Sequence, residues 1–158
     1  MDLISTLAEI VGAEGLLTGD DVRKRFVSWV DQGPCQALAI VRPATTGQVS
    51  RVLAACNAAG QPVVPMGGLT GLVRGCVAGP DEVGVSLERM HRVEAVDPVN
   101  RTMTVEAGVP LQVIQEEAER HGLLYPVDFG ARGSAHIGGS VATNAGGNSV
   151  IRYGMTRE

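Results

Sequence analysis

Two groups of glycines, mixed with small hydroxyl and amide side chains, are the residues best suited to chemistry in this chain. The first group, residues 67–72 with the sequence Gly-Gly-Leu-Thr-Gly-Leu, directly follows a short apolar run, and Gly75 comes soon after. A phosphate group needs several backbone N–H groups that point at it, and glycines leave room for that approach. A tight turn whose glycines only adopt positive φ explains the loop equally well, so both interpretations stay open.

The second group spans residues 133–147 and again combines glycine pairs with Ser, Thr and Asn. Neither group has the GK[ST] ending of a P-loop or the GxGxxG spacing of a nicotinamide-binding Rossmann domain. Two such loops in one short chain predict a long ligand that carries phosphate in its middle.

Composition narrows the classes of partner. The chain has 158 residues, of which 44% are hydrophobic and 19% charged, so we expect a folded domain. A net charge of -4 and an aromatic content of 3% argue against nucleic acid, because there is neither a basic stripe nor a stacking platform. No run approaches the 18 apolar residues of a membrane span. We therefore expect a soluble, cytoplasmic chain.

The cysteines and histidines do not form a recognisable site. Cys35, Cys56 and Cys76 are odd in number and form no CxxC pair, which argues against a disulfide framework or a zinc knuckle. The three histidines share no metal-ligand spacing, so no metal is expected.

Hydrophobic periodicity indicates the elements that hold the glycine groups in place. The expected elements of the first half are helices at 3–11 and 20–25, a strand at 37–41, a helix at 46–59 that Thr45 caps, and a strand at 62–65. On the helix at 46–59, one face is expected to pack on the core and carries Val49, Val52, Leu53 and Cys56. A strand, a helix and a parallel strand in succession place ligands at the carboxyl ends of the strands. Trp29 is expected to be a buried apolar anchor.

The second half predicts a strand at 83–87, a hairpin of 92–96 with 101–107, and a helix at 111–121. Beyond that helix the chain is dense in glycine, and we expect loops. The expected organisation is a helical lead-in at 1–35, a first subdomain at 36–80, and the start of a second subdomain at 81–158.

Several motifs together resemble the FAD-linked oxidases of the vanillyl-alcohol-oxidase type, also called PCMH-type FAD-binding proteins. The motifs are Val63-Val64-Pro65-Met66-Gly67-Gly68-Leu69-Thr70-Gly71-Leu72, Glu106-Ala107-Gly108, Gly122-Leu123-Leu124-Tyr125-Pro126, Ile137-Gly138-Gly139 and Ala142-Thr143-Asn144-Ala145-Gly146-Gly147. The chain most resembles the D-2-hydroxyglutarate dehydrogenase branch, with the D-lactate dehydrogenases and the glycolate oxidase FAD subunit nearby. The resemblance covers residues 36–158.

This resemblance implies an α+β fold: a small α/β subdomain with short parallel strands, followed by an incomplete second α+β subdomain. It implies FAD as cofactor, with residues 65–72 around the pyrophosphate and 133–147 along the pyrophosphate and the flavin ring. The implied cofactor-binding residues are Pro65, Gly67, Gly68, Leu69, Thr70, Gly71, Leu72, Gly75, Pro126, Gly133, Ser134, Ile137, Gly138, Gly139, Ser140, Thr143, Asn144 and Gly147.

The implied reaction is oxidation of a 2-hydroxy acid by hydride transfer to flavin N5. We expect noncovalent FAD, because covalent members carry a histidine in or beside the first loop and none lies between Pro65 and Gly75. Leu69 stands where the close branch often has asparagine, and Met66 replaces a commoner polar residue, so altered FAD affinity is expected.

The resemblance places the catalytic residues in a substrate domain beyond residue 158. The chain alone is therefore expected to be inactive, and its incomplete sheet is expected to favour self-association or a partner chain. Two alternatives stay open: a stand-alone domain that has lost FAD, and one chain of a split flavoenzyme.

Overall fold

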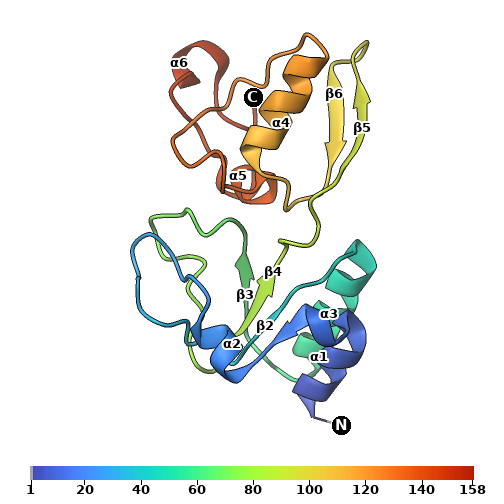
Figure 1. The fold of residues 1–158 in the computed structure, drawn as a ribbon, viewed down its shortest axis with the longest axis vertical. Helices are drawn as coiled ribbons and strands as arrows, with labels where there is room; N and C mark the ends of the chain where they lie inside the picture. Colours follow the sequence, from blue (N-terminus) through green and yellow to red (C-terminus); the bar gives the residue numbers. More distant parts are fainter. Residues whose placement is uncertain (1) are drawn as a thin grey trace. The chain divides into compact units, whose positions relative to one another are not determined.

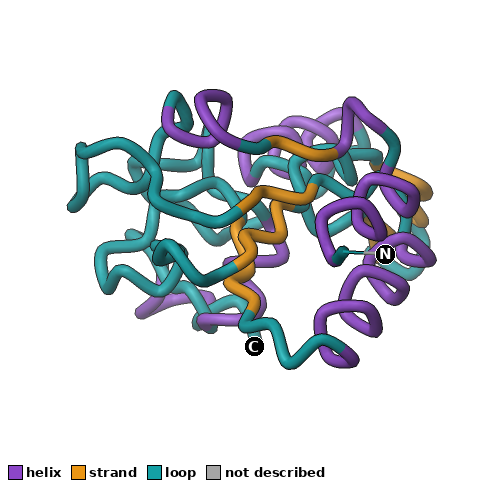
Figure 2. Tube along the Cα trace, turned by 90° about the horizontal axis from the view of Figure 1, so that it is seen from below, coloured by secondary structure: helices purple, strands orange, loops and turns teal. Residues whose placement is uncertain are grey.

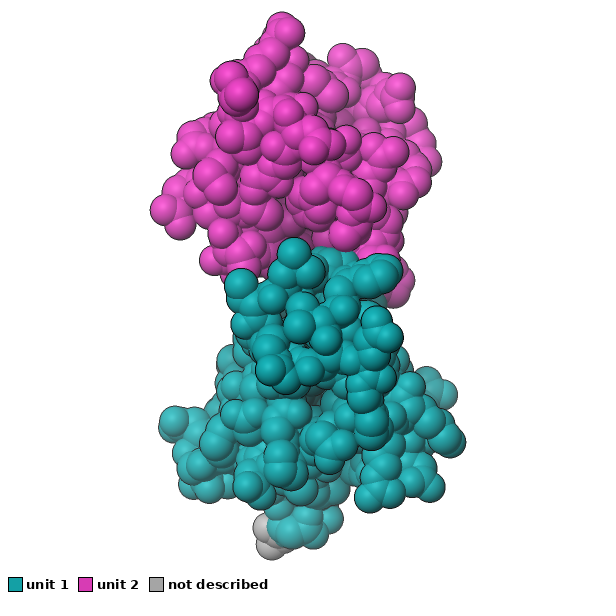
Figure 3. All heavy atoms as spheres, turned by 90° about the vertical axis from the view of Figure 1, so that its left-hand side faces the viewer, with its two compact units in different colours: residues 1–89 teal, residues 90–158 magenta. Residues whose placement is uncertain are grey.

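The chain forms two units that divide after Arg89. The computed structural model describes residues 2–158, and the units comprise residues 1–89 and 90–158 (Figure 3). Short helices and strands occur in both, joined by long loops (Figure 2). The division differs from the one expected near residue 81, because strand β4 (Val83–Ser86) pairs inside the sheet of the first unit.

Three parallel strands form the centre of the first unit (Figure 1). The sheet has the order β1-β2-β4-β3, with β1 (Leu16–Leu17) antiparallel to β2 (Ala39–Val41) and β3 (Val63–Met66) on the far side of β4. The expected strand, helix and parallel strand are thus confirmed as β2, α3 (Thr46–Ala58) and β3, with β4 inserted between the two strands.

Successive residues of each strand face opposite sides of the sheet, and each side has its own core. Helix α1 (Leu3–Val11) and helix α3 cover one side, where Leu7 and Val52 pack on Val41 and Val83. On the other side, Ile40 and Met66 pack against helix α2 (Gly19–Arg23) and the segment that follows it. A short 3-10 turn, η1 (Ala13–Gly15), joins α1 to β1.

Capping residues explain where the first-unit helices begin. The Asp2 carboxylate accepts a hydrogen bond from the Ser5 N–H at 3.0 Å, and the Thr45 hydroxyl accepts one from the Gln48 N–H at 3.2 Å. Gly12 ends α1 with φ of 76°, as expected of a residue without Cβ.

Two expectations for the first unit are wrong. Trp29 is 61% exposed, and its indole meets the ring of Phe26 edge-on, with 6.1 Å between the ring centroids. Leu53 was expected on the buried face of α3 and is 43% exposed, whereas Val52 and Cys56 are buried. The apolar stripe of α3 is narrow: Val52 and Cys56 face the core, and Leu53 lies beside this stripe.

The second unit consists of a hairpin and three helices. Strands β5 (Val93–Asp97) and β6 (Thr102–Val105) pair antiparallel, and the Asp97 carboxylate closes their turn by accepting hydrogen bonds from the Val99 and Asn100 N–H groups. Helix α4 (Leu111–Arg120) follows, and its Ile114 packs with Val109 and Ile137 on the hairpin.

The glycine-rich remainder of the second unit holds two helices that the sequence did not predict. They are α5 (Ile137–Thr143), inside the second glycine group, and α6 (Val150–Tyr153). Helix propensity does not predict α5, because Gly138 and Gly139 lie inside it and glycine weakens a helix interior by about 1 kcal/mol. The fold class expected from the resemblance, mixed α+β with a small parallel sheet, is confirmed.

We predict that Leu7→Ala lowers the free energy of unfolding of the first unit by about 3 kcal/mol, because Leu7 is fully buried between α3 and the sheet. Urea denaturation followed by far-UV circular dichroism measures the change. Leu53→Ala is the matched control, since it shortens an exposed leucine and should cost less than about 1 kcal/mol. Equal losses in the two variants would contradict this packing.

Candidate functional site

The first glycine group lies at the carboxyl edge of the parallel sheet, directly after β3. The last bond of the ladder joins the Leu87 N–H to the Met66 carbonyl at 3.2 Å. Beyond it, Gly67 to Gly75 form a loop without regular structure. This is the edge at which open parallel sheets bind ligands.

The loop offers a run of unused donors. Among the described residues, no hydrogen bond uses the backbone N–H groups of residues 67–73. A Cβ placed on Gly71 or Gly75 would meet no atom within 4 Å, so the backbone there faces open space. Free amides beside glycines that face open space fit an anion such as a phosphate group.

The two residues that depart from the resembling family contribute to the core of the first unit. Leu69 holds a left-handed backbone with φ of 58°, and its side chain packs against the core cluster that includes Met66 and Ile40. Met66 is buried, and its thioether lies over Gly84, where a Cβ would come within 2.8 Å of the sulfur. Both side chains therefore contribute to the packing of the first unit, and their effect on FAD affinity stays a prediction.

An ion cluster lies at the same edge, after β2 and β4. Glu88 accepts hydrogen bonds from Arg42 at 3.1 Å, from the Ser86 hydroxyl at 3.2 Å and from Arg25. Burial raises the pKa of Glu88, but the pairs with Arg25 and Arg42 and the hydroxyl outweigh it, so the pKa lies below the ordinary 4.5. The carboxylate is thus charged in the folded protein at neutral pH.

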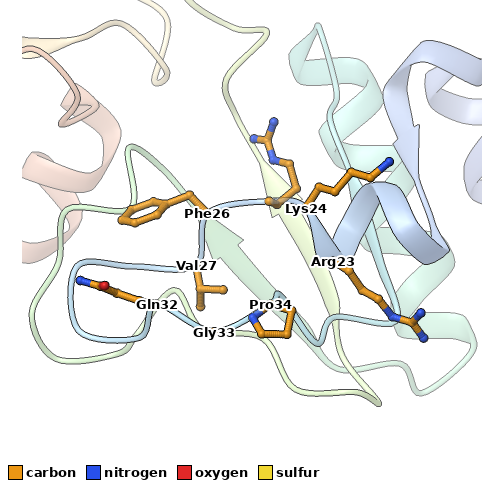
Figure 4. A pocket seen from close by; sticks show the side chains of 8 residues that line it. Arg23, Lys24, Phe26, Val27, Gln32, Gly33 and Pro34 are labelled. Atoms are coloured by element: carbon orange, nitrogen blue, oxygen red, sulfur yellow. The ribbon is translucent and has the colours of Figure 1, made fainter.

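A shallow pocket of about 510 Å³ lies over the segment after α2 (Figure 4). The basic residues of its lining are already paired, Arg23 with Asp20 and Lys24 with Asp21, and Arg25 with the ion cluster. In Figure 4, Arg23 and Phe26 extend in opposite directions. The lining therefore does not converge on one ligand, and we assign no site there.

The second glycine group divides into residues that pack and residues that are open. A Cβ on Gly138 would lie 2.9 Å from the Ala107 carbonyl oxygen, and one on Gly147 would strike the Asp128 backbone. A Cβ on Gly139, in contrast, meets nothing within 4 Å. Close packing within the unit therefore accounts for Gly138 and Gly147, and their contact with a cofactor stays a prediction.

The backbone N–H groups of the second glycine group also fall into two sets, those that are hydrogen-bonded and those that are free among the described residues. The Ile137 and Gly138 N–H groups bond to Val109 and Ala107 carbonyls at 2.9 and 2.8 Å. The N–H groups of Gly139, Gly146 and Gly147 donate no hydrogen bond within residues 2–158.

The polar side chains of the second group mostly turn to nearby backbone. Thr143 donates to the Gly139 carbonyl at 2.8 Å, and Ser140 lies 3.5 Å from the His136 carbonyl. The Asn144 amide oxygen accepts from the Arg157 N–H at 2.9 Å. Ser134 is exposed. The hydroxyl groups of Ser140 and Thr143 are thus already directed at nearby backbone carbonyls.

An apolar cleft of about 610 Å³ in the second unit was not anticipated from the sequence. It lies between the hairpin, α4 and the segment 122–126, and Met103, Tyr125 and Pro126 are among its lining residues. Burial raises the pKa of Tyr125, and the Thr156 hydroxyl partly offsets that effect. Pro126, a predicted cofactor-binding residue, lines this cleft.

Within residues 2–158, no three His, Cys, Asp or Glu side chains gather as a metal site would require. The three cysteines are free thiols, with Cys35 and Cys56 buried. None of the helices in this part of the chain has both the length and the apolar character to cross a membrane.

The sequence matches the family described as FAD binding domain over residues 37–158. It is 48% identical, over 130 residues, to a D-2-hydroxyglutarate dehydrogenase of Xanthomonas citri pv. viticola; the match covers 82% of this chain and 28% of that protein. It is 35% identical to a D-lactate dehydrogenase of Anaerostipes hadrus, with 99% and 33% covered. The chain thus spans about a third or less of these relatives.

The fold is also that of solved structures. An alkyldihydroxyacetonephosphate synthase superposes with a TM-score of 0.84 at 19% identity, over 98% of this chain and 34% of that one. At this identity the likeness concerns the fold alone.

We predict that Glu88→Gln lowers the free energy of unfolding at pH 7 by about 1–2 kcal/mol, because Arg25 and Arg42 lose a charged partner. The pKa of Glu88 is lowered in the folded state, so its contribution is present above pH 4.5 and is lost as pH falls further. The difference between wild type and variant in urea denaturation should therefore shrink from pH 7 to pH 3. A constant difference would contradict this assignment.

The two classes of glycine should separate by stability. Gly147→Ala should cost roughly 2 kcal/mol or more, because the methyl group strikes the Asp128 backbone. Gly139→Ala should be neutral or stabilise α5 by up to about 1 kcal/mol, because the position is helical and open. Thermal unfolding followed by circular dichroism measures both. A destabilised Gly139→Ala would show that this face is packed.

Proposed function

This chain belongs to the FAD binding domain family, and from that premise we propose that it binds FAD noncovalently for an enzyme that oxidises a 2-hydroxy acid. The acid would be of the D-lactate or D-2-hydroxyglutarate type, which the names of the two relatives above carry, or of the glycolate type, which the resemblance adds. The observation that supports FAD binding most directly is the run of unpaired amides at residues 67–73, at the carboxyl edge of the parallel sheet.

We assign residues 65–72 and Gly75 to the pyrophosphate. Backbone N–H groups are neutral donors, and a pyrophosphate offers them several negative oxygens at once. The open space beside Gly71 and Gly75 lets that group approach the backbone. Thr70, whose hydroxyl makes no hydrogen bond within residues 2–158, adds a donor.

We assign residues 133–147 to the rest of the cofactor, with Gly139 and Gly146 as the backbone donors. Both N–H groups are unpaired among the described residues, and Gly139 faces open space. Gly138 and Gly147 take a different role, which is to let α5 and the following turn approach Ala107 and Asp128.

FAD, when bound, supplies the acceptor for a hydride from the substrate carbon. The residues of this chain hold and orient the cofactor. We place the catalytic residues in the part of such enzymes that this chain does not match, because it spans 28% of the D-2-hydroxyglutarate dehydrogenase. The chain alone is then inactive toward hydroxy acids.

Noncovalent binding is supported by the residues around the loop. No histidine lies between Pro65 and Gly75. Cys76 follows, but burial raises the pKa of its thiol, and the sulfur lies 3.9 Å from the Val27 carbonyl oxygen. A thiol held in its protonated form is a poor nucleophile for attachment to a flavin.

Association with another chain or domain is part of the proposal. The second unit exposes Leu124, Val141 and Ile151, and its two-stranded hairpin has unpaired edges. Apolar groups and strand edges of this kind favour contact with further protein. A cytoplasmic location stays a prediction, since some similar proteins are mitochondrial by name, including one from Oryza sativa.

The test is the visible absorbance of the purified chain after incubation with FAD and desalting. We expect retained flavin bands, and Gly71→Ala should weaken FAD binding at least roughly tenfold, because its methyl group occupies the space of the phosphate. Gly47→Ala, on an exposed turn of α3, is the control and should bind like wild type. Wild-type protein that folds but retains no flavin and shows no FAD affinity would overturn the proposal.

A further inference from the structure

The segment between α2 and β2 braces the first glycine loop. Residues 26–34 and the loop after β3 lie side by side in the first unit (Figures 1 and 4). Two contacts join them: Arg74 pairs with Asp31, and the Cys76 sulfur lies 3.9 Å from the Val27 carbonyl oxygen. The sequence separation of 43 residues between Asp31 and Arg74 gives no local signal of this contact.

A buried serine, Ser28, fixes the position of Asp31. Ser28 is fully buried, and its hydroxyl accepts hydrogen bonds from the Asp31 N–H at 2.9 Å and the Val30 N–H at 3.2 Å. The Ser28 N–H in turn donates to the Asp31 carbonyl at 3.3 Å. This closed turn holds the Asp31 carboxylate toward the loop before any ligand binds.

The guanidinium of Arg74 meets that carboxylate in a two-pronged pair. Nε and Nη2 each donate to a different oxygen of Asp31 at 2.7 Å. Asp31 is 27% exposed and Arg74 63%, so the pair is only partly screened by solvent. Two parallel bonds fix orientation as well as distance, which a single ion pair between flexible side chains does not do.

Arg74 needs such a partner because of its backbone. Its φ is 61°, a left-handed conformation that strains any residue with a Cβ. The residue lies between the free amides of 67–73 and Gly75, so its conformation decides where both point. We propose that the Asp31–Arg74 pair is a positioning clamp that holds the glycine loop in the form that receives phosphate; this inference rests on the proposed FAD binding.

The clamp makes Arg74 a positioning residue and not a ligand of the phosphate. Asp31 compensates the charge of Arg74, and the Arg74 side chain is directed at the segment 26–34 that contains Asp31. Glycine at position 74 would adopt the same φ without strain and without a clamp. Alanine would keep the strain and lose the clamp.

We test this with FAD titrations, followed by flavin fluorescence, of a double-mutant cycle in the purified chain. Arg74→Ala and Asp31→Asn should each weaken FAD binding roughly fivefold, whereas Arg74→Gly should stay within about twofold of wild type. In the Arg74→Gly background, Asp31→Asn should have no further effect, because no clamp remains to be broken. Arg101→Ala is the control and should bind FAD like wild type. Arg101 also has a positive φ, of 57°, but it lies in the hairpin turn of the second unit.

Equal weakening by Arg74→Gly and Arg74→Ala would overturn the clamp, because the guanidinium would then act on the ligand itself. Limited digestion with proteinase K without FAD gives a second readout, because a loop that has lost its clamp is cut more readily. Cleavage within residues 67–75 should be faster in Arg74→Ala and Asp31→Asn than in wild type, even if no form of the chain binds FAD. Unchanged cleavage would refute the clamp, whereas failure of wild type to bind FAD would refute only the proposed function.

Discussion

The candidate site depends on where the hydrogen-bond ladder between β3 and β4 stops. Inside a sheet every strand amide that faces a neighbour has a partner, and such amides have nothing left for a ligand. Here the ladder ends at the Met66 carbonyl, and the chain turns before Gly68 can continue it. The unpaired amides of residues 67–73 therefore begin where this ladder ends, at the edge of the sheet where β2 and β4 also end.

The pairing of β4 with both β2 and β3 also depends on close packing at Gly84. β4 lies between β2 and β3, and Gly84 leaves the space that Met66 and Ile40 fill from one face. The glycines of this chain thus serve two purposes that their sequence cannot separate. Gly84, Gly138 and Gly147 admit neighbouring groups of the same chain, whereas Gly71, Gly75 and Gly139 face open space.

Much of the fold could be predicted from local patterns. The Thr45 cap, the apolar strands and the Asp97 turn each leave a signal within a few residues, and each element was found close to its expected bounds. Contacts between distant residues leave no such signal. The placement of β4 in the first unit, the exposure of Trp29 and the ion pair of Asp31 with Arg74 all depend on segments brought together by the sheet. Helix α5 was missed because packing against Val109 and Ala107 overrides the poor helix propensity of its glycines.

The exposure of Trp29 has a spectroscopic consequence. It is the single tryptophan of the chain, it lies on the segment that braces the glycine loop, and its indole is largely open to solvent. A flavin absorbs in the region where tryptophan emits, so a cofactor held by that loop would quench this one emitter by energy transfer. The protein thus carries, at the edge of its candidate site, an optical label whose brightness reports the loading of the loop without chemical modification.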